Sequence, residues 1–557
     1  MKLLTAALLL VVAVGVTACR SGPAETPTAV NAGAPAAAPV AAAPLTFGQH
    51  HHPIRTANPE AQKMFDQGLA QAFGFHHEAA IRSFERAAEL DPSSPMPHWG
   101  KAWALGPNYN LDIDEPRAKA AYESLAKAQS LASTGAEREQ AYVAALATRY
   151  PADPSADRAA LARAFSQAMR DLSRRYPDDL DAAVIYAESL MNLTPWKLWT
   201  ADGAPAANTE HIVAVLESVL LRNPNHLGAN HYYIHAVEAS RTPGRAFASA
   251  QRLAALAESS GHLLHMPAHV YARTGDHAGA AAANAAGAAA DRRYLLTAPA
   301  NGTYGMMYYA HNLHFLVDSH MMQGRFGDAK QAADRTAEHL HPHAAMMPMV
   351  ESMVIAPISV LLRFAKDSEI LALEPPPAER MVQRAWHHFA RGTALARTDK
   401  AHDADAERKL LSAAIAAVPE SAAFGGGGWA PAKSTLAIAV ASLDARIAAA
   451  RGEHDRAIKH WQQAVAAADQ LPYDEPPVWF YPVRESLGAA LLAAGRAADA
   501  ERVFREDLVK HPRNARALFG LHIALATQGK ETDAAWVRRE FDAAWKNADT
   551  TLTIADF

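Results

Sequence analysis

Two segments near opposite ends of the chain share one spacing of small, aromatic and proline residues. The first has the order Gly68, Ala80, Phe84, Ala87, Pro92, and the second has the order Gly488, Gly495, Ala500, Phe504, Pro512. Small residues at such intervals let two helices cross closely, the phenylalanine fills the core between them, and the proline ends the second helix. The spacing therefore predicts antiparallel helix pairs that repeat along the chain, an open-ended array rather than one globular core.

This spacing matches the tetratricopeptide repeat (TPR), a helix pair of about 34 residues with a glycine near its turn. Three further units show the same glycine-to-alanine interval: Gly275/Ala280, Gly324/Ala329 and Gly452/Ala457, the last followed by Trp461 and Ala464. Four looser matches lie at Tyr122 to Tyr150, Leu161 to Leu193, Ala229 to Ala257 and Leu518 to Trp545. The expected fold is all-α, a TPR-like helix-pair solenoid coiled as a right-handed superhelix.

Two interruptions divide the predicted array. One is Glu374 to Pro377, and the other is Phe424 to Trp429, whose glycines lack the preceding strand and the Lys-Ser/Thr ending of a nucleotide loop. We expect a turn at each. We place a domain boundary near residue 400, so that residues 58–400 form an N-terminal array with a histidine-rich concave face and residues 401–557 form C-terminal repeats.

Charge and cysteine content exclude several classes of function. The 557 residues include 53 Lys and Arg and 58 Asp and Glu, a net charge of −5, and charges of both signs are interspersed. A chain without a basic stripe is not expected to bind nucleic acid. Cys19 is the sole cysteine, so neither an intramolecular disulfide nor a zinc site of several thiolates can form.

The N-terminus has the pattern of a bacterial export signal. Met1-Lys2 precedes an apolar run from Leu3 to Val16 that is too short for a stable membrane span. The sequence Val16-Thr17-Ala18-Cys19 resembles the lipobox of bacterial lipoproteins. This resemblance implies a signal peptide over residues 1–18 and a lipid on Cys19 that anchors the chain in a membrane.

The residues after the cysteine bear on where the chain resides. Arg20 stands where an aspartate signals inner-membrane retention, so the resemblance implies a periplasm-facing lipoprotein of the outer membrane. The following stretch is rich in Pro, Ala and Thr and has few large apolar residues. Such a composition cannot bury enough surface to offset its ordering entropy, which predicts a disordered tether over residues 19–57, including a flexible run at His50 to His52.

Histidines gather on three consecutive helices that the repeat pattern assigns to the inner, concave wall. One carries His231, His235 and Glu238 at i, i+4 and i+7, which places them on one face. The next carries His262, His265 and His269, and the third carries His311 and His314. Because neighbouring helix axes lie only about 8 to 10 Å apart, these imidazoles can converge on one pocket.

Imidazole is the commonest metal ligand, so this arrangement predicts a divalent metal site. Its expected ligands are His231, His235, His265, His269, His311 and His314, and Glu238 is expected to ligate the ion or act as a base. Pro267 should start or kink its helix and turn His262 away from the others. Two alternatives remain open: hydrogen-bonded core histidines, and histidines that line a peptide-binding groove.

Zinc is the ion that this ligand set favours, and copper is the alternative because methionines crowd the same region. They are Met306, Met307, Met321, Met322, Met346, Met347, Met349 and Met353. Methionine at helical spacing also serves as flexible core filling.

Motifs of the common hydrolases are missing from the sequence. After His77-Glu78, Ile81 and Arg82 occupy the places where a zinc protease needs its second histidine. No Gly-x-Ser-x-Gly elbow occurs, and lipidation of Cys19 would leave no cysteine nucleophile. A covalent mechanism therefore has no visible candidate.

Several phrases resemble an uncharacterised family of bacterial TPR proteins, over most of residues 58–530. They include Asn58-Pro59-Glu60-Ala61-Gln62, Met191-Asn192-Leu193-Thr194-Pro195-Trp196, His265-Met266-Pro267-Ala268-His269, Tyr309-Ala310-His311-Asn312 and Tyr473-Asp474-Glu475-Pro476-Pro477. The resemblance implies the TPR-like fold and no particular reaction.

Two functions follow from these patterns. The first is a lipid-anchored scaffold of the cell envelope whose concave groove binds a protein or peptide, with Glu188, Asn192, Tyr308 and Asn312 as groove residues. The second is a metal-dependent enzyme, for example a hydrolase, whose bound ion activates water inside the solenoid.

Overall fold

Helices make up most of the computed structural model, which describes residues 46–152, 156–298, 302–344, 350–424 and 430–557. The signal peptide, Cys19 and the Gly425–Gly428 run lie outside the described residues. The predicted all-α fold is confirmed: within the described ranges the only sheet pairs two short strands, β1 (Ala423–Phe424) and β2 (Ala430–Pro431).

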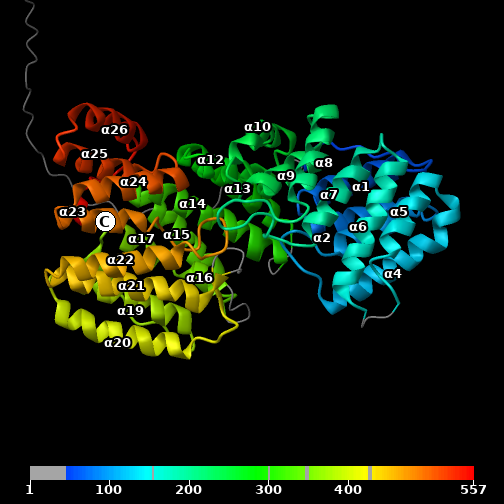
Figure 1. Cartoon of the computed structure of the whole chain (residues 1–557). Helices are drawn as coiled ribbons and strands as arrows, with labels where there is room; N and C mark the ends of the chain where they lie inside the picture. Colours follow the sequence, from blue (N-terminus) through cyan, green and yellow to red (C-terminus); the bar gives the residue numbers. More distant parts are fainter. Residues whose placement is uncertain (1–45, 153–155, 299–301, 345–349, 425–429) are drawn as a thin grey trace, which may run out of the picture. The chain divides into compact units, whose positions relative to one another are not determined.

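The five units that match the repeat closely are all antiparallel helix pairs (Figure 1). They are α1 (Pro59–Phe73) with α2 (His77–Leu90), α12 (Pro267–Arg273) with α13 (His277–Leu295), α14 (Ala310–Met322) with α15 (Phe326–Leu340), α21 (Ala432–Ala450) with α22 (His454–Ala468), and α23 (Arg484–Ala493) with α24 (Ala497–Lys510).

The four looser matches are helix pairs as well. They are α4 (Glu115–Leu131) with α5 (Glu137–Ala147), α6 (Arg158–Arg175) with α7 (Leu180–Met191), α9 (Leu227–Val237) with α10 (Phe247–Leu256), and α25 (Ala515–Thr527) with α26 (Glu531–Ala544). The remaining α-helices are α3 (Met96–Leu105), α8 (Thr209–Arg222), α11 (Gly261–His265), α16 (Glu351–Val354), α17 (Ala356–Arg363), α18 (Asp367–Leu371), α19 (Met381–Arg397) and α20 (Ala401–Ala417).

Phe84 shows how the repeat spacing builds a hairpin. Its fully buried ring lies between Gly68 of α1 and Gly100 of α3, and a Cβ at either glycine would come within 2.6 or 2.5 Å of it. Phe504 occupies the equivalent place between Gly488 of α23 and Gly520 of α25. The glycines thus make room for one large ring that joins three helices.

The boundary expected near residue 400 does not separate two compact units. Residue 400 lies in the turn between α19 and α20, which pack against each other along their length. The described residues between 46 and 557 form one compact unit.

Residues 46–57, which composition places in the tether, are ordered against the helices. Phe47 and Ile54 are buried in the same apolar core as the first helix pairs. His52 is also buried, so the expected flexible run at His50 to His52 is not found. His50 and His52 both pair with Asp181 on α7, and the ring of His50 packs against that of His226, which caps α9; composition gives no hint of these distant partners.

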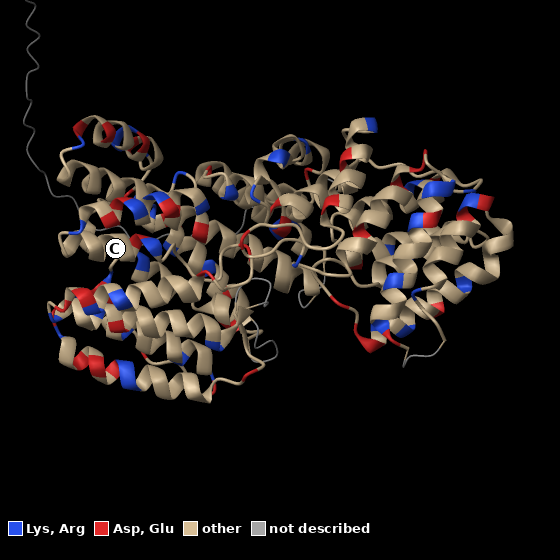
Figure 2. Cartoon of the chain, viewed as in Figure 1, with Lys and Arg blue, Asp and Glu red and all other residues tan. Residues whose placement is uncertain are grey.

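Charged residues of both signs alternate over the helices, without a basic stripe (Figure 2). Among the described residues, no helix has the length and apolar content needed to cross a bilayer.

Candidate metal centre

Four elements carry the histidines of the site. His231 and His235 lie on α9, with Glu238 at its C-terminal end. His262 and His265 lie on α11, and His269 lies on α12. A π-helical turn, η3 (Gly305–Tyr309), leads into α14, which carries His311. Such turns are frequent at functional sites because they displace side chains from the regular helical positions.

Pro267 does not turn His262 away, contrary to expectation. Met266, between α11 and α12, keeps right-handed helical angles (φ −49°, ψ −35°), so the chain continues in nearly the same direction. All three histidines of this segment consequently point inward and are no more than 2% exposed.

Imidazoles from α9 and α11 form a first set, which we call the three-imidazole site: His231, His235 and His262. One ligand atom from each lies within 4.8 Å of the others. Nε2 of His231 is 3.0 Å from Nε2 of His262, and all three rings are buried.

A second set comprises His265, His269 and His311. Nε2 of His265 lies 2.7 Å from Nε2 of His269 and 3.1 Å from Nε2 of His311. On its other side, Nδ1 of His265 donates to Oδ1 of Asn284 at 2.6 Å. Burial and the neighbouring imidazoles lower the pKa of His265, as they do for His231 and His262. These rings are therefore neutral and have a lone pair to offer.

Two buried carboxylates flank the imidazoles. Glu238 places Oε1 3.0 Å from Nδ1 of His235 and Oε2 2.6 Å from Nδ1 of His269. Oε2 of Glu475, in the loop between α22 and α23, lies 2.9 Å from the same Nδ1 of His269. Burial alone would lower the pKa of His269, but the charges of Glu475 and Glu238 outweigh it and raise it to about 10.

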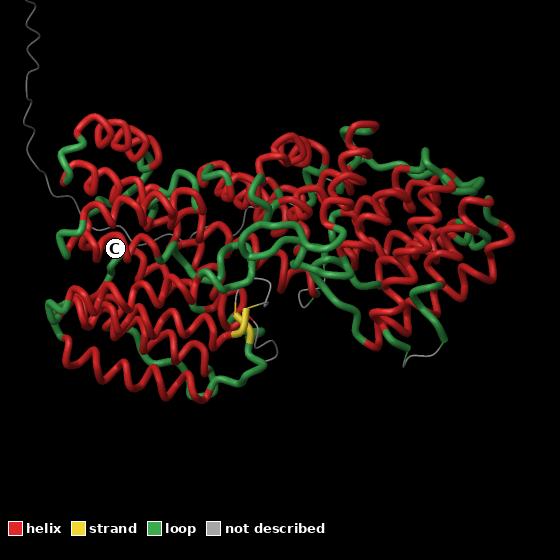
Figure 3. Tube along the Cα trace, viewed as in Figure 1, coloured by secondary structure: helices red, strands yellow, loops and turns green. Residues whose placement is uncertain are grey.

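A small pocket opens onto the cluster. Its lining includes His235, His262, His269, His311, Tyr308 and Glu475. The free volume is about 60 Å³, room for a few water molecules or the reacting end of a substrate. Long loops gather in the middle of the view in Figure 3. Two loops, between α3 and α4 and between α7 and α8, supply Asn110 and Trp196 to the wall.

The structure thus brings together His231, His235, His265, His269, His311 and Glu238 from the predicted set. It places His314 elsewhere, in a separate hollow lined by Val317, Asp318 and Trp386. Of the methionines that suggested copper, Met307 lines the pocket, while Met321 and Met353 pack in apolar clusters.

Of the four predicted groove residues, one lines the pocket and the other three form hydrogen bonds with one another or with Asp291. Tyr308 lines the pocket. Asn312 instead donates to Asp291 at 2.5 Å and is fully buried. Asn192 donates to Oε1 of Glu188 at 2.7 Å, and Glu188 is buried. Sequence reasoning missed Glu475, because no local pattern links that loop to α12.

A second cluster of titratable groups surrounds Asp181. His52, His50 and His226 approach its carboxylate at 2.7, 2.9 and 3.1 Å. However, Nδ1 of His226 accepts a hydrogen bond from the amide of Ala229 and caps α9. Its Nε2 must then carry the proton and face Asp181, which removes His226 as a metal ligand. This cluster is an ion-paired clamp on the N-terminal segment.

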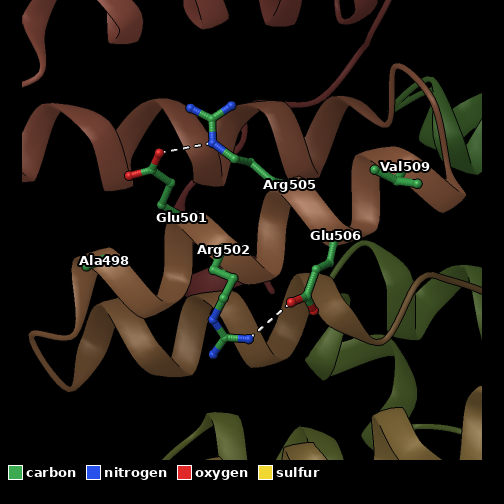
Figure 4. A pocket seen from close by; sticks show the side chains of 6 residues that line it. All are labelled: Ala498, Glu501, Arg502, Arg505, Glu506 and Val509. Atoms are coloured by element: carbon green, nitrogen blue, oxygen red, sulfur yellow. Dashed lines mark hydrogen bonds and ion pairs between the residues drawn. The ribbon is translucent and has the colours of Figure 1, made fainter.

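A shallow hollow on α24 has a different character (Figure 4). Arg505 pairs with Glu501 and Arg502 pairs with Glu506, each one turn away on the same helix. Val509, at its edge, is 82% exposed. Because the charges neutralise one another along a solvated face, nothing converges there on a ligand.

No protein-family model matches the sequence, and no curated protein matches it either. Solved structures of similar fold include a human IFIT1 dimer with PPP-AAAA, at 12% identity and a TM-score of 0.33, covering 86% of this chain and 89% of that one. Another is the APC/C hetero-tetramer Cut9-Hcn1, at 13% identity and a TM-score of 0.28, covering 89% and 94%. Likeness at this level carries no information about ligands or partners.

Proposed function

We propose that the chain is a metalloprotein that holds a divalent transition-metal ion on the three-imidazole site, His231, His235 and His262. The observation that carries the proposal is the direction of the ring lone pairs. Hydrogen bonds at one nitrogen of a ring determine that the lone pair is on the other nitrogen.

Two of the three rings have their proton placed by an acceptor. Nδ1 of His231 lies 2.6 Å from the carbonyl oxygen of Phe73, which can only accept, so that nitrogen carries the proton. Nδ1 of His235 lies 3.0 Å from Oε1 of Glu238 and donates likewise. The Nε2 atoms of both rings are then unprotonated. A carboxylate or carbonyl behind an imidazole is the usual support of a metal-binding histidine.

A network of hydrogen bonds alone leaves this site incomplete. If Nε2 of His262 donates to Nε2 of His231, that one contact is satisfied. Nε2 of His235 and Nδ1 of His262 still have no hydrogen-bond partner among the described residues, although both are buried. Orphaned buried nitrogens are costly, and a cation between the rings removes the penalty at His235.

Three neutral imidazoles are a ligand set of catalytic zinc sites. His235 and His262 also line the pocket, whose wall includes Tyr308 and Glu475. A zinc ion held by these rings would act as a Lewis acid that supplies hydroxide at neutral pH. The chemistry that these residues support is hydrolysis of a small substrate, with Glu475 as proton acceptor and Glu238 holding His235 in position.

Elemental analysis of the purified full chain tests the proposal. We expect at least one equivalent of zinc, copper, iron or manganese, and one equivalent fewer in His231→Ala and in His262→Ala. His314→Ala is the matched control, since that ring lies in a separate hollow, and it should keep the metal. A chain that carries no metal, and takes up none on titration with Zn²⁺, rules the proposal out. Hydrolysis of ester, phosphoester and peptide substrates, with and without chelator, then identifies the reaction.

A peptide-binding scaffold was the other expected function. Its histidines would line an open groove, whereas His231, His235 and His265 are at most 1% exposed, which favours the metal. Binding of an envelope protein elsewhere on the helices is compatible with the metal site.

Export and lipid attachment at Cys19 are proposed from the lipobox-like sequence. Incorporation of labelled fatty acid that Cys19→Ala abolishes would support the anchor. Membrane fractionation then tests the outer-membrane location that Arg20 suggests.

A further inference from the structure

Beside the three-imidazole site, His269 meets two carboxylates in an arrangement that hydrogen bonds do not explain. Its Nδ1 lies 2.6 Å from Oε2 of Glu238 and 2.9 Å from Oε2 of Glu475. Yet among the described residues neither contact has hydrogen-bond geometry, and both oxygens of Glu475 lack any hydrogen-bond partner. All three side chains are at most 3% exposed.

A chain of hydrogen bonds orients the His269 ring. Asn284 donates Nδ2 to the carbonyl of Ala280, so its Oδ1 faces His265 as an acceptor. Nδ1 of His265 donates to that oxygen at 2.6 Å, which leaves Nε2 of His265 to accept. Nε2 of His269 lies 2.7 Å from it and donates. The lone pair of a neutral His269 is then on Nδ1, directed towards the two carboxylates.

One imidazole faces two carboxylates at this point, so even a protonated His269 supplies only one positive charge against two negative ones. Glu238 and Glu475 bring two negative charges into a buried volume, where unpaired charges are strongly unfavourable. The charge of Arg273 acts on Glu475, but its guanidinium donates to the backbone oxygens of Glu238 and Ser240 and lies over the ring of Tyr473. A lone pair within 3 Å of two carboxylate oxygens is repulsive unless a cation lies among them.

We propose that His269, Glu238 and Glu475 hold a second divalent cation next to the three-imidazole site. This inference rests on the proposed function, which it extends to a two-ion centre in which Glu475 would ligate through Oε2 and keep Oε1 as the proton acceptor. Glu238 links the two ions, because Oε1 supports His235 of the first site while Oε2 reaches the second. One imidazole and two carboxylates suit an ion that accepts nitrogen and oxygen ligands, such as Zn²⁺, Mn²⁺ or Fe²⁺.

Metal stoichiometry separates this inference from the proposal on which it rests. The full chain is treated with chelator, titrated with Zn²⁺, desalted and analysed for bound zinc. We expect two equivalents in the unmodified chain, one in Glu475→Gln, one in His262→Ala and none in the double variant. Glu475→Gln keeps the shape of the side chain, and circular dichroism confirms that each variant is folded. His314→Ala should bind two equivalents.

A single equivalent that Glu475→Gln leaves unchanged would overturn the inference and leave the proposed function standing. In that event a second proton on the ring, which makes His269 an imidazolium, pairs it with the carboxylates in place of a metal ion. Binding of no zinc by the unmodified chain would overturn both. The stoichiometry of the unmodified chain gives this answer even where a variant fails to fold.

Discussion

The guanidinium of Arg363 clasps the carboxylate of Glu485 with two parallel contacts, Nη1 to Oε2 at 2.5 Å and Nη2 to Oε1 at 3.1 Å. Both side chains are no more than 2% exposed, and Asn514 donates to the same carboxylate at 2.8 Å. The pair joins α17 to α23, elements that come from different repeats.

Loss of one member of this pair should be strongly destabilising. Glu485→Gln leaves a buried arginine without its counter-charge, so we expect the free energy of unfolding to fall by about 3 to 5 kcal/mol. Urea denaturation measures the change. The exposed pair of Arg502 and Glu506 on α24 is the control, because Glu506→Gln should cost less than about 0.5 kcal/mol. Equal effects at the two sites would contradict the buried role.

The clamp around Asp181 predicts a pH window of stability. Burial opposes its ionisation, but the charge of His50 and hydrogen bonds from the histidines hold the pKa of Asp181 well below its usual range. Burial also opposes the charge on His50, yet Asp181 raises the His50 pKa above its usual value. The contribution of Asp181 is lost as pH falls through its lowered pKa, and that of His50 is lost as pH rises through its raised pKa.

Asp181→Asn should therefore destabilise the chain most between about pH 4 and 6.5, the ordinary values of the two groups. Thermal unfolding from pH 3 to 9 measures the difference, and faster proteolysis near residues 46–57 should accompany it. Asp178→Asn, whose side chain is 98% exposed, is the control and should change neither readout. A difference that does not vary with pH would show that the clamp is not ionic.

Ionisation of the buried Asp291 carboxyl should lower the free energy of unfolding as pH rises. Burial raises its pKa to about 7, although Tyr304 and Asn312 donate to it and lower the value in part. Since the folded pKa lies above the unfolded one, its favourable contribution is full in acid and is lost as pH rises through about 7. At about 1.4 kcal/mol for each pKa unit, stability should fall by roughly 4 kcal/mol between pH 4 and 8.

Asp291→Asn tests this expectation through the pH dependence of stability, not through the stability at a single pH. The substitution also disturbs one of the two donated hydrogen bonds, so an overall loss of stability is expected. The pH dependence between 4 and 8 should nevertheless flatten, as seen in urea midpoints measured at closely spaced pH values. An unchanged slope would assign the pH dependence to other groups.

Gly68→Ala should overpack the first helix pair. The added Cβ would come within 2.6 Å of Phe84, a ring held on both sides. Overpacking of this kind costs about 1 to 3 kcal/mol. Adding Phe84→Leu to the same chain should recover part of the loss by opening space. If the double variant is simply the sum of the two single ones, the contact between Gly68 and Phe84 does not control the crossing.

Metal removal should lower the thermal stability of the chain. A ligand that binds only the folded state stabilises it by about 2.7 kcal/mol at one hundred times its dissociation constant. Chelator should therefore lower the melting temperature, and Zn²⁺ should restore it. The double variant of His262→Ala and Glu475→Gln, which should hold no ion, should melt at the same temperature with and without chelator.

The helix pairs were predictable because each is specified locally. Gly68 and Phe84 lie within one unit of sequence, and their spacing alone requires two helices to cross at that point. The convergence of His231, His235, His265 and His269 followed from the same repeat pattern, since it places them on successive inner helices. The position of His262 did not follow, because the effect of Pro267 depends on the angles at Met266, which sequence does not give.

Contacts between distant segments were not predictable. Glu475 reaches His269 from a loop, and nothing in the residues around it distinguishes that acid from an exposed one. The order of residues 46–57 likewise depends on Asp181 and His226, which lie on different helices. In both cases the contact is made by a residue from a distant segment, and local composition does not indicate which segments pack together.

Proteins built of stacked repeats commonly gain or lose a whole unit at one end during evolution, because each unit touches only its neighbours. This chain is constrained in that respect, since the loop that carries Glu475 precedes its last two helix pairs. A chain that ended with α22 would keep the site's histidines and would lose the loop that carries Glu475. Removal of the last helix pairs together with this loop would therefore change the lining of the pocket as well as the length of the array.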